Sequence, residues 1–204
     1  MPVRLLTLLF CGVALAQNRL PPDAAGLYRQ AQDDFRAGRV KQSVEAFDRV
    51  AAMVPDGAPM LWQRGIALYY VGRYEDCRLQ FESHRTVNPD DVENAAWHYL
   101  CVARQSTPAK ARAALLPVGP DPRMPMREIY RLYRGELKPA DVLSVAGTRE
   151  EALFSAHLYI AMWYEAQGLR ADARRHFALA AEPRFENAGG YMWDVATVHL
   201  KQMK

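Results

Sequence analysis

Apolar positions between residues 58 and 91 recur every three to four residues, in two successive runs. The first run covers residues 58–71 and the second covers residues 74–87, with Gly72 between them. A period of 3.6 residues is typical of helices that bury one face. The second run ends before Pro89, and the residue that precedes a proline is disfavoured in helical backbone. We therefore predict two amphipathic helices that fold back on each other at Gly72.

The same pattern occurs upstream with a shift of 34 residues. Small residues, turn glycines, phenylalanines and prolines correspond between the two segments: Ala31 with Gly65, Gly38 with Gly72, Phe47 with Phe81 and Pro55 with Pro89. The small residue lets the partner helix approach closely, and the phenylalanine fills the space between the helices. The sequence thus predicts two successive helix pairs, at residues 24–57 and 58–91, each turning at a glycine.

The pattern weakens and then returns further along the chain. Residues 92–116 read as a degenerate third pair, and residues 117–153 as a proline-rich loop with short helices. The loop at 117–125 is either packed against the array or a domain boundary. Residues 154–204 contain a further pair and a last helix at 191–203, which would cover the final exposed face. Helix caps are expected at three positions: Asp23, Thr107 and Thr148.

The first residues have the features of a secretory signal peptide. Arg4 precedes the apolar run Leu5 to Ala14, and Ala14-Leu15-Ala16 is a small-x-small cleavage signal. The run is too short to span a bilayer, and an ordinary buried first helix is the alternative. We expect residues 1–16 to be removed, residues 17–23 to form a short leader, and the mature chain to be periplasmic or secreted, without stable membrane insertion. Cys11 follows Phe10 rather than a small residue, which disfavours a lipid-anchored cysteine.

This arrangement resembles the tetratricopeptide repeat (TPR) family over residues 24–204. The positions that carry the resemblance are Gly38, Phe47, Pro55, Gly65, Gly72, Phe81, Pro89, Ala161, Tyr164, Gly168, Phe177 and Ala180. It implies an all-α fold, a TPR-type α-solenoid of about three to four helix-turn-helix units with a C-terminal capping helix. With its N-terminal leader, the chain is also loosely similar to bacterial envelope repeat proteins of the NlpI-like kind, whose repeats act as adaptors that recruit other proteins.

The composition contains little that indicates catalysis. The net charge is +3 without a basic run, which disfavours nucleic-acid binding. No HExxH, nucleophile elbow, P-loop or dinucleotide fingerprint is present. Cys101 has His98 one turn before it, yet it lies within a helix rather than at an electropositive helix start. We predict no catalytic residue, no metal site and no cofactor. Cys77 and Cys101 either form a disulfide or are core thiols, and the core thiol is the commoner arrangement.

Recognition of another protein is the remaining class of function. In the TPR family the first helix of each pair lines a concave groove. Transferring that face to this chain gives Tyr28, Gln32, Phe35, Trp62, Ile66, Tyr69, Tyr70, Trp97, Cys101 and Arg104, with Leu158, Met162 and Glu165 continuing it in the last pair. Aromatic residues and arginine dominate interface energetics. Packing between helices is the alternative for Trp62 and Trp97, and residues 117–147 could fill the groove from within.

The sequence therefore favours a non-catalytic adaptor of the cell envelope that binds a protein or an extended peptide. An envelope enzyme with an unrecognised site on the repeat scaffold is one alternative. A self-associating structural protein, forming a homo-oligomer through exposed repeat faces, is the other.

Overall fold

The computed structural model describes residues 20–203, and the described residues form helices and turns without any strand. The all-α prediction is confirmed. The predicted signal peptide, Cys11 and residues 17–19 of the predicted leader lie outside the described residues, and the last two leader residues already belong to the first described helix. No helix within the described range is both long enough and apolar enough to cross a bilayer.

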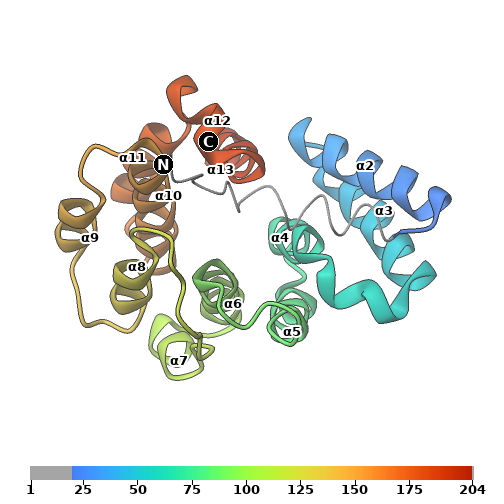
Figure 1. Ribbon diagram of the computed structural model, residues 1–204, viewed down its shortest axis with the longest axis horizontal. Helices are drawn as coiled ribbons and strands as arrows, with labels where there is room; N and C mark the ends of the chain where they lie inside the picture. The colour runs from blue at the N-terminus through green and yellow to red at the C-terminus, as the bar shows by residue number, and fades with distance from the viewer. Residues whose placement is uncertain (1–19, 204) are drawn as a thin grey trace, which may run out of the picture.

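The helices follow one another along an arc, and the last of them lies back near the first (Figure 1). Their bounds are α2 Pro22–Arg36, α3 Val40–Met53, η1 Pro55–Met60, α4 Trp62–Tyr70, α5 Tyr74–His84, α6 Val92–Gln105, α7 Pro108–Ala113, α8 Met126–Tyr133, α9 Pro139–Ala146, α10 Glu150–Ala166, α11 Arg170–Ala180, η2 Pro183–Phe185, α12 Glu186–Gly189 and α13 Tyr191–Gln202.

Three helix pairs turn at a glycine with the same left-handed backbone. The φ angles of Gly38, Gly72 and Gly168 are 77°, 78° and 77°. In each turn the N–H after the glycine donates to a carbonyl five residues earlier, as Arg39 does to Asp34 at 2.8 Å. This bond satisfies a carbonyl that the helix end would otherwise leave without a partner. Gly135, between α8 and α9, has the same φ of 79° and was not recognised as a turn of this kind.

A close contact between a small residue and a phenylalanine joins the helices of the second pair. An ideal Cβ at Gly65 would lie 2.8 Å from Cε2 and Cζ of Phe81, so any larger residue would collide with the ring. Phe81 is almost completely buried. The residues at the equivalent positions of the other two pairs, Ala31 and Phe47 and Ala161 and Phe177, are all fully buried. The predicted small and large positions therefore belong to the core in all three pairs.

The helix ends differ from the prediction in several places. The helix expected from residue 58 begins at Trp62, because Pro55 to Met60 form a 3-10 helix that contains Pro59. The turn residue Pro55 starts this 3-10 helix, whereas Pro89 lies in an ordinary turn. Asp23 and Thr148 were wrong as caps, since α2 begins at Pro22 and α10 begins at Glu150, both without a side-chain cap bond. Thr107 caps α7, accepting from Lys110 N at 3.2 Å.

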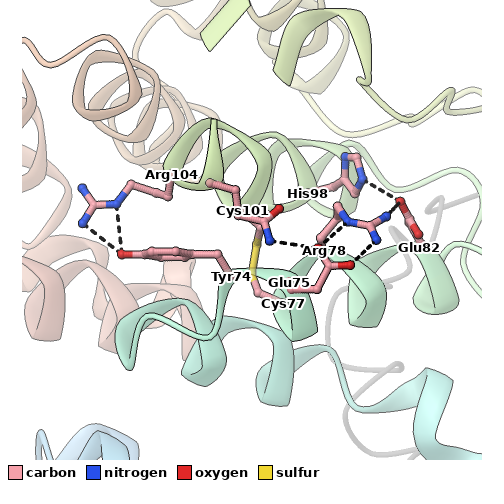
Figure 2. Close-up of a disulfide and its surroundings, with 9 residues drawn as sticks. Tyr74, Glu75, Cys77, Arg78, Glu82, His98, Cys101 and Arg104 are labelled. Atoms are coloured by element: carbon pink, nitrogen blue, oxygen red, sulfur yellow. Dashed lines mark hydrogen bonds and ion pairs between the residues drawn. A yellow bond between two sulfur atoms is a disulfide. The ribbon is translucent and has the colours of Figure 1, made fainter. Parts of the chain in front are cut away.

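The cysteine pair is a disulfide rather than two core thiols. Cys77 on α5 and Cys101 on α6 are joined, with their Cα atoms 5.9 Å apart (Figure 2). The two helices are neighbours that belong to successive helix pairs, so the bond joins one pair to the next. The sequence could not decide this question because it does not contain the distance between the two helices.

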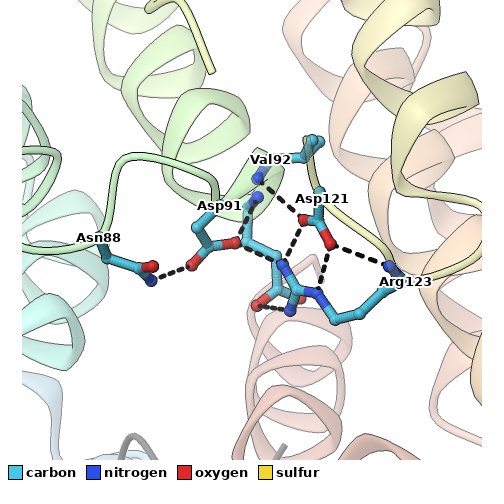
Figure 3. Close-up of polar contacts among 6 residues, drawn as sticks. Asn88, Asp91, Val92, Asp121 and Arg123 are labelled. Atoms are coloured by element: carbon cyan, nitrogen blue, oxygen red, sulfur yellow. Dashed lines mark hydrogen bonds and ion pairs between the residues drawn. The ribbon is translucent and has the colours of Figure 1, made fainter. Parts of the chain in front are cut away.

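One arginine holds the proline-rich segment against the array. Arg123 contacts the carboxylates of Asp91 and Asp121, each at 2.6 Å, and that of Glu93 at 3.4 Å (Figure 3). Asp91 caps α6 by accepting from Glu93 N at 3.0 Å. Gly119 also donates to the carbonyl of Pro89 at 3.1 Å. The loop is therefore packed on the start of α6, which disfavours a flexible domain boundary at this position.

We predict that Phe81→Ala lowers the free energy of unfolding by about 3–5 kcal/mol, because it removes a buried ring and leaves a cavity beside Gly65. Urea denaturation followed by circular dichroism measures this loss. Leu79→Ala on the same helix is the matched control, since Leu79 is 48% exposed, and its effect should stay within about 0.5 kcal/mol. Equal losses in the two variants would mean that the contact between Gly65 and Phe81 does not organise the pair.

We also predict that the Cys77–Cys101 bond stabilises the fold by about 2–4 kcal/mol, since it closes a loop of 24 residues in the unfolded chain. Comparison of the wild type with Cys77→Ser/Cys101→Ser in urea measures the difference. Alkylation followed by mass spectrometry of the untreated protein should find neither of these thiols free. A modified Cys77 or Cys101 in that experiment would contradict the pairing.

Candidate functional site

A cavity of about 370 Å³ lies where the end of the chain meets the repeat units. Its walls come from four parts of the array: the end of α4, the end of α6, the turn from α10 to α11, and α13. The lining residues are Tyr69, Tyr70, Arg104, Glu165, Gly168, Arg170, His199, Gln202 and Met203. Cavities of this size are in the range that small ligands occupy, so this is the candidate site.

Helix α13 closes the site by contacting both ends of the array. It packs on α11, as the predicted capping helix should, and it also reaches α2 (Figure 1). Asp194 accepts from Arg36 Nε at 2.8 Å. The Tyr191 ring stacks on Phe35 at a centroid distance of 5.7 Å and meets Trp62 edge-on at 5.4 Å. The inner side of the first two helix pairs is thus covered by a helix of the same chain.

A buried hydrogen-bonded chain forms one wall of the cavity. Tyr70 Oη lies 2.8 Å from Nδ1 of His199, and Nε2 of the same imidazole lies 3.0 Å from Glu165 Oε2. The donor and acceptor roles of Tyr70 and Nδ1 depend on the imidazole tautomer, and Nε2 faces the carboxylate of Glu165. Phe177 stacks on the imidazole with ring centroids 3.9 Å apart. The histidine is therefore held by contacts on both nitrogens and on one face of its ring.

The ionisation of these groups follows from their surroundings. Burial opposes charge on Glu165, but the hydrogen bond from His199 and the nearby Arg104 outweigh it, so the pKa of Glu165 lies below its usual value. Burial, together with the charge of Glu165, raises the pKa of Tyr70 well above its usual value. Tyr70 thus stays protonated, which makes it a poor nucleophile at neutral pH.

Two arginines supply positive charge at the cavity. Arg104 donates to Tyr74 Oη at 3.0 and 3.1 Å, as Figure 2 shows, and lies over the ring of Tyr69. Its Nη1 atom is 3.9 Å from Glu165. Arg170 is exposed, and among the described residues it forms no ion pair. One guanidinium at the cavity therefore lacks a counter-charge within the described chain.

The predicted groove residues divide into two groups. Arg104 is exposed, Trp62, Tyr70 and Glu165 are half-buried, and the remainder are buried, namely Tyr28, Gln32, Phe35, Ile66, Tyr69, Trp97, Cys101, Leu158 and Met162. The buried group packs between helices; Trp97, for example, stacks on Phe81. Tyr69 and Tyr70 from α4, Arg104 from α6 and Glu165 from α10 converge on the cavity. His199, Arg170, Gln202 and Met203 were not among the predicted site residues.

Cys101 offers no free thiolate in this structure, because its sulfur is bonded to Cys77. His98, one turn before it, lies instead 3.2 Å from Glu82 Oε1. Cys101 and His98 therefore do not form an activated thiol nucleophile in this structure. Within residues 20–203, no group of three or more potential metal ligands is gathered in one place.

Two other histidines form a buried pair away from the cavity. Nδ1 of His157 lies 3.0 Å from Nδ1 of His176, so one nitrogen must donate while the other accepts. Burial and the neighbouring His157 lower the pKa of His176 to about 4. The pKa of His157 is also lowered, chiefly by burial. The pair is stable only while at least one ring is neutral, since two imidazolium rings would place protons on both nitrogens.

No protein-family model matches this chain, and a comparison with curated proteins finds no match. The similarity to tetratricopeptide repeats therefore depends on the spacing of the chain's own residues.

We predict that acid destabilises the fold through the pair of His157 and His176. Because the folded pKa of His176 lies below the unfolded value of about 6.5, folding favours the neutral ring, and this stability is complete above that value. It is lost as the pH falls from about 6.5 towards 4. Urea denaturation at pH 7 and pH 5 measures the loss. His176→Gln, which cannot be protonated, should lose less stability than the wild type over this interval, and an equal loss would contradict the role of the pair.

Proposed function

We propose that this protein is a non-catalytic helical-repeat scaffold that binds another protein, and that its binding surface is the inner side of the arc. The helix pairs are the TPR-type units of an α-solenoid, and the partner is a helical or extended segment. This function retains the adaptor role that the sequence favours. The alternative of an envelope enzyme is supported by one feature, the polar contacts among Tyr70, His199 and Glu165.

One observation carries the proposal: the inner side already binds a helix. Helix α13 lies against α2 and α4 through two side chains. Tyr191 packs on the rings of Phe35 and Trp62, and Asp194 accepts a hydrogen bond from Arg36. Aromatic residues and arginine are the residue types that dominate binding energy in interfaces. A surface that holds a helix of its own chain with these groups is suited to a segment of another protein that carries an aromatic residue and a nearby acidic one.

The partner would have to compete with α13 for this surface. Gly189 and Gly190 precede the helix, and the φ of Gly190 is 51°, a backbone conformation that favours glycine. Only a few side chains of α13 contact α2 and α4, whereas the helix also packs along α11. The contact with the first pairs is thus the weaker of its two attachments, and a partner could replace it without unfolding the last pair.

The compartment proposed for this function is oxidising, either the periplasm or the exterior of a bacterial cell. The disulfide between Cys77 and Cys101 supports it, because disulfides persist in such compartments and are rare in the cytosol of mesophiles. The sequence pattern of residues 1–16 agrees with export.

The proposal is tested by two variants, each of which removes one partner of the contact between Tyr191 and Trp62. Tyr191→Ala removes an α13 side chain and leaves the inner side intact, so more partner should be captured. Trp62→Ala removes the receiving side chain, so less should be captured. The measurement is affinity capture from an envelope extract of the source cells, with quantitative mass spectrometry, and Leu79→Ala serves as the control on an exposed part of α5.

Opposite changes for the same captured protein would support the proposal. A purely structural contact between Trp62 and Tyr191 would instead make both variants change capture in the same direction, because both would simply loosen the fold. No protein enriched over the control, or changes of equal sign, would therefore overturn it. Light scattering of the purified chain measures its molar mass and so tests the alternative of self-association. The mass of one copy is expected for the adaptor, and a multiple of it for a self-associating structural protein.

A further inference from the structure

We propose that the cavity between α13 and the repeat units binds a small organic anion, with a carboxylate or phosphate head and an apolar or aromatic body. The cavity adjoins the protein-binding surface of the inner side, but Trp62 and Tyr191 do not line it, and the proposal does not depend on that function. Its support comes from the size, the charge and the wall chemistry of the cavity.

The first argument is the size of the space. His199, Gln202 and Met203 from the end of the described chain line it together with Tyr70 and Arg104 from its first half. The space is partly open to solvent and has a volume of about 370 Å³, which suits a small molecule better than an extended peptide that must run through a groove.

The second argument is charge. Arg104 and Arg170 both line the cavity, and Glu165 is the one carboxylate among its lining residues. That carboxylate already contacts His199 at 3.0 Å, and its separation from Arg104 is 3.9 Å. Arg170 pairs with no carboxylate in the described chain. The cavity thus has an excess of positive charge, and guanidinium groups match the planar oxygens of carboxylate and phosphate.

The third argument is the rest of the wall. The side chains of Tyr69, Tyr70 and Met203 give the cavity an apolar side, and the amide of Gln202 adds a donor and an acceptor. Tyr69 and Tyr70 meet edge to face with centroids 5.6 Å apart, which fixes both rings. A purely inorganic ion would leave this apolar surface unused. The chemistry therefore favours an anion whose body contacts tyrosine and methionine side chains.

The test uses four probes on the chain without residues 1–16: benzoate, phenyl phosphate, inorganic phosphate and the uncharged benzamide. Isothermal titration calorimetry gives the affinity, and thermal unfolding reports stabilisation by the bound probe. We expect saturable binding of benzoate or phenyl phosphate, and preference between these two identifies the head group. Benzamide should not bind, because it has the ring without the charge.

Variants locate the site. Arg170→Ala should weaken binding about tenfold or more, since a hydrogen bond to a charged group is typically worth that much. Arg127→Ala is the matched control: it removes the same charge from an exposed position on α8 that does not line the cavity. Because Arg170 is exposed and forms no described ion pair, the variant should retain the wild-type circular dichroism spectrum.

Three results would overturn the proposal. The first is equal weakening by Arg170→Ala and Arg127→Ala, which would indicate general charge attraction. The second is inorganic phosphate binding as tightly as the organic probes, which would indicate an adventitious ion only. The third is no binding of any probe at millimolar concentration. Failure here would leave the capture experiment with Tyr191→Ala and Trp62→Ala unaffected, because neither residue lines the cavity.

Discussion

The contact between a small residue and a phenylalanine sets the distance between the two helices of a pair, and the remaining structure depends on it. At Gly65 no side chain larger than hydrogen fits, because a Cβ would lie 2.8 Å from the Phe81 ring. The equivalent positions in the other two pairs, Ala31 and Phe47 and Ala161 and Phe177, are fully buried as well. Since protein interiors are densely packed, a fixed distance within each pair also fixes where the next pair can lie. The arc of helices is the accumulated result of these local contacts.

Closure of the arc by α13 is a second constraint of a different kind. It combines an exposed ion pair, Arg36 with Asp194, with aromatic contacts around Tyr191 and the buried chain of His199. Partly exposed ion pairs stabilise proteins only weakly, so the aromatic and imidazole contacts supply most of the closure. The cavity lies beside the contact between His199 of α13 and Tyr70 at the end of α4. Protein binding and anion binding are thus proposed near the two ends of the same helix, at Tyr191 and at Gln202.

The sequence predicted the parts of the fold that are local. The glycine turns and the small and large positions are recognisable because they recur at fixed spacing and each has a conformational or steric reason. It did not predict the second attachment of α13, because periodicity shows that Tyr191 lies on an apolar face but not which distant rings it meets. The sequence also did not show that Phe35 and Trp97 are buried. It placed both residues on an inner face, but whether that face is open depends on elements far along the chain.

The cavity was only partly predictable for the same reason. Tyr69, Tyr70 and Arg104 were recognised from their positions within the repeat units, together with Glu165. His199 read as an isolated histidine on a helix, and its partners Tyr70 and Glu165 come from other units. Arg170 lies two residues after Gly168, a glycine that was interpreted as structural. Nothing local marks these residues as parts of one site, because their proximity follows from closure of the arc.

The separation of Arg36 from Asp194, 158 residues along the chain, has a consequence for the order of folding. Each helix pair can form as soon as its own residues are available, since its contacts are close in sequence. The closing contact must wait until the last helix has been synthesised, and loop-closure entropy makes such a distant contact late. Until then Phe35, Trp62 and Tyr70 lie uncovered on a nearly complete array. During this interval the protein exposes an aromatic surface that the finished molecule buries, so the nascent chain is the form most prone to premature association.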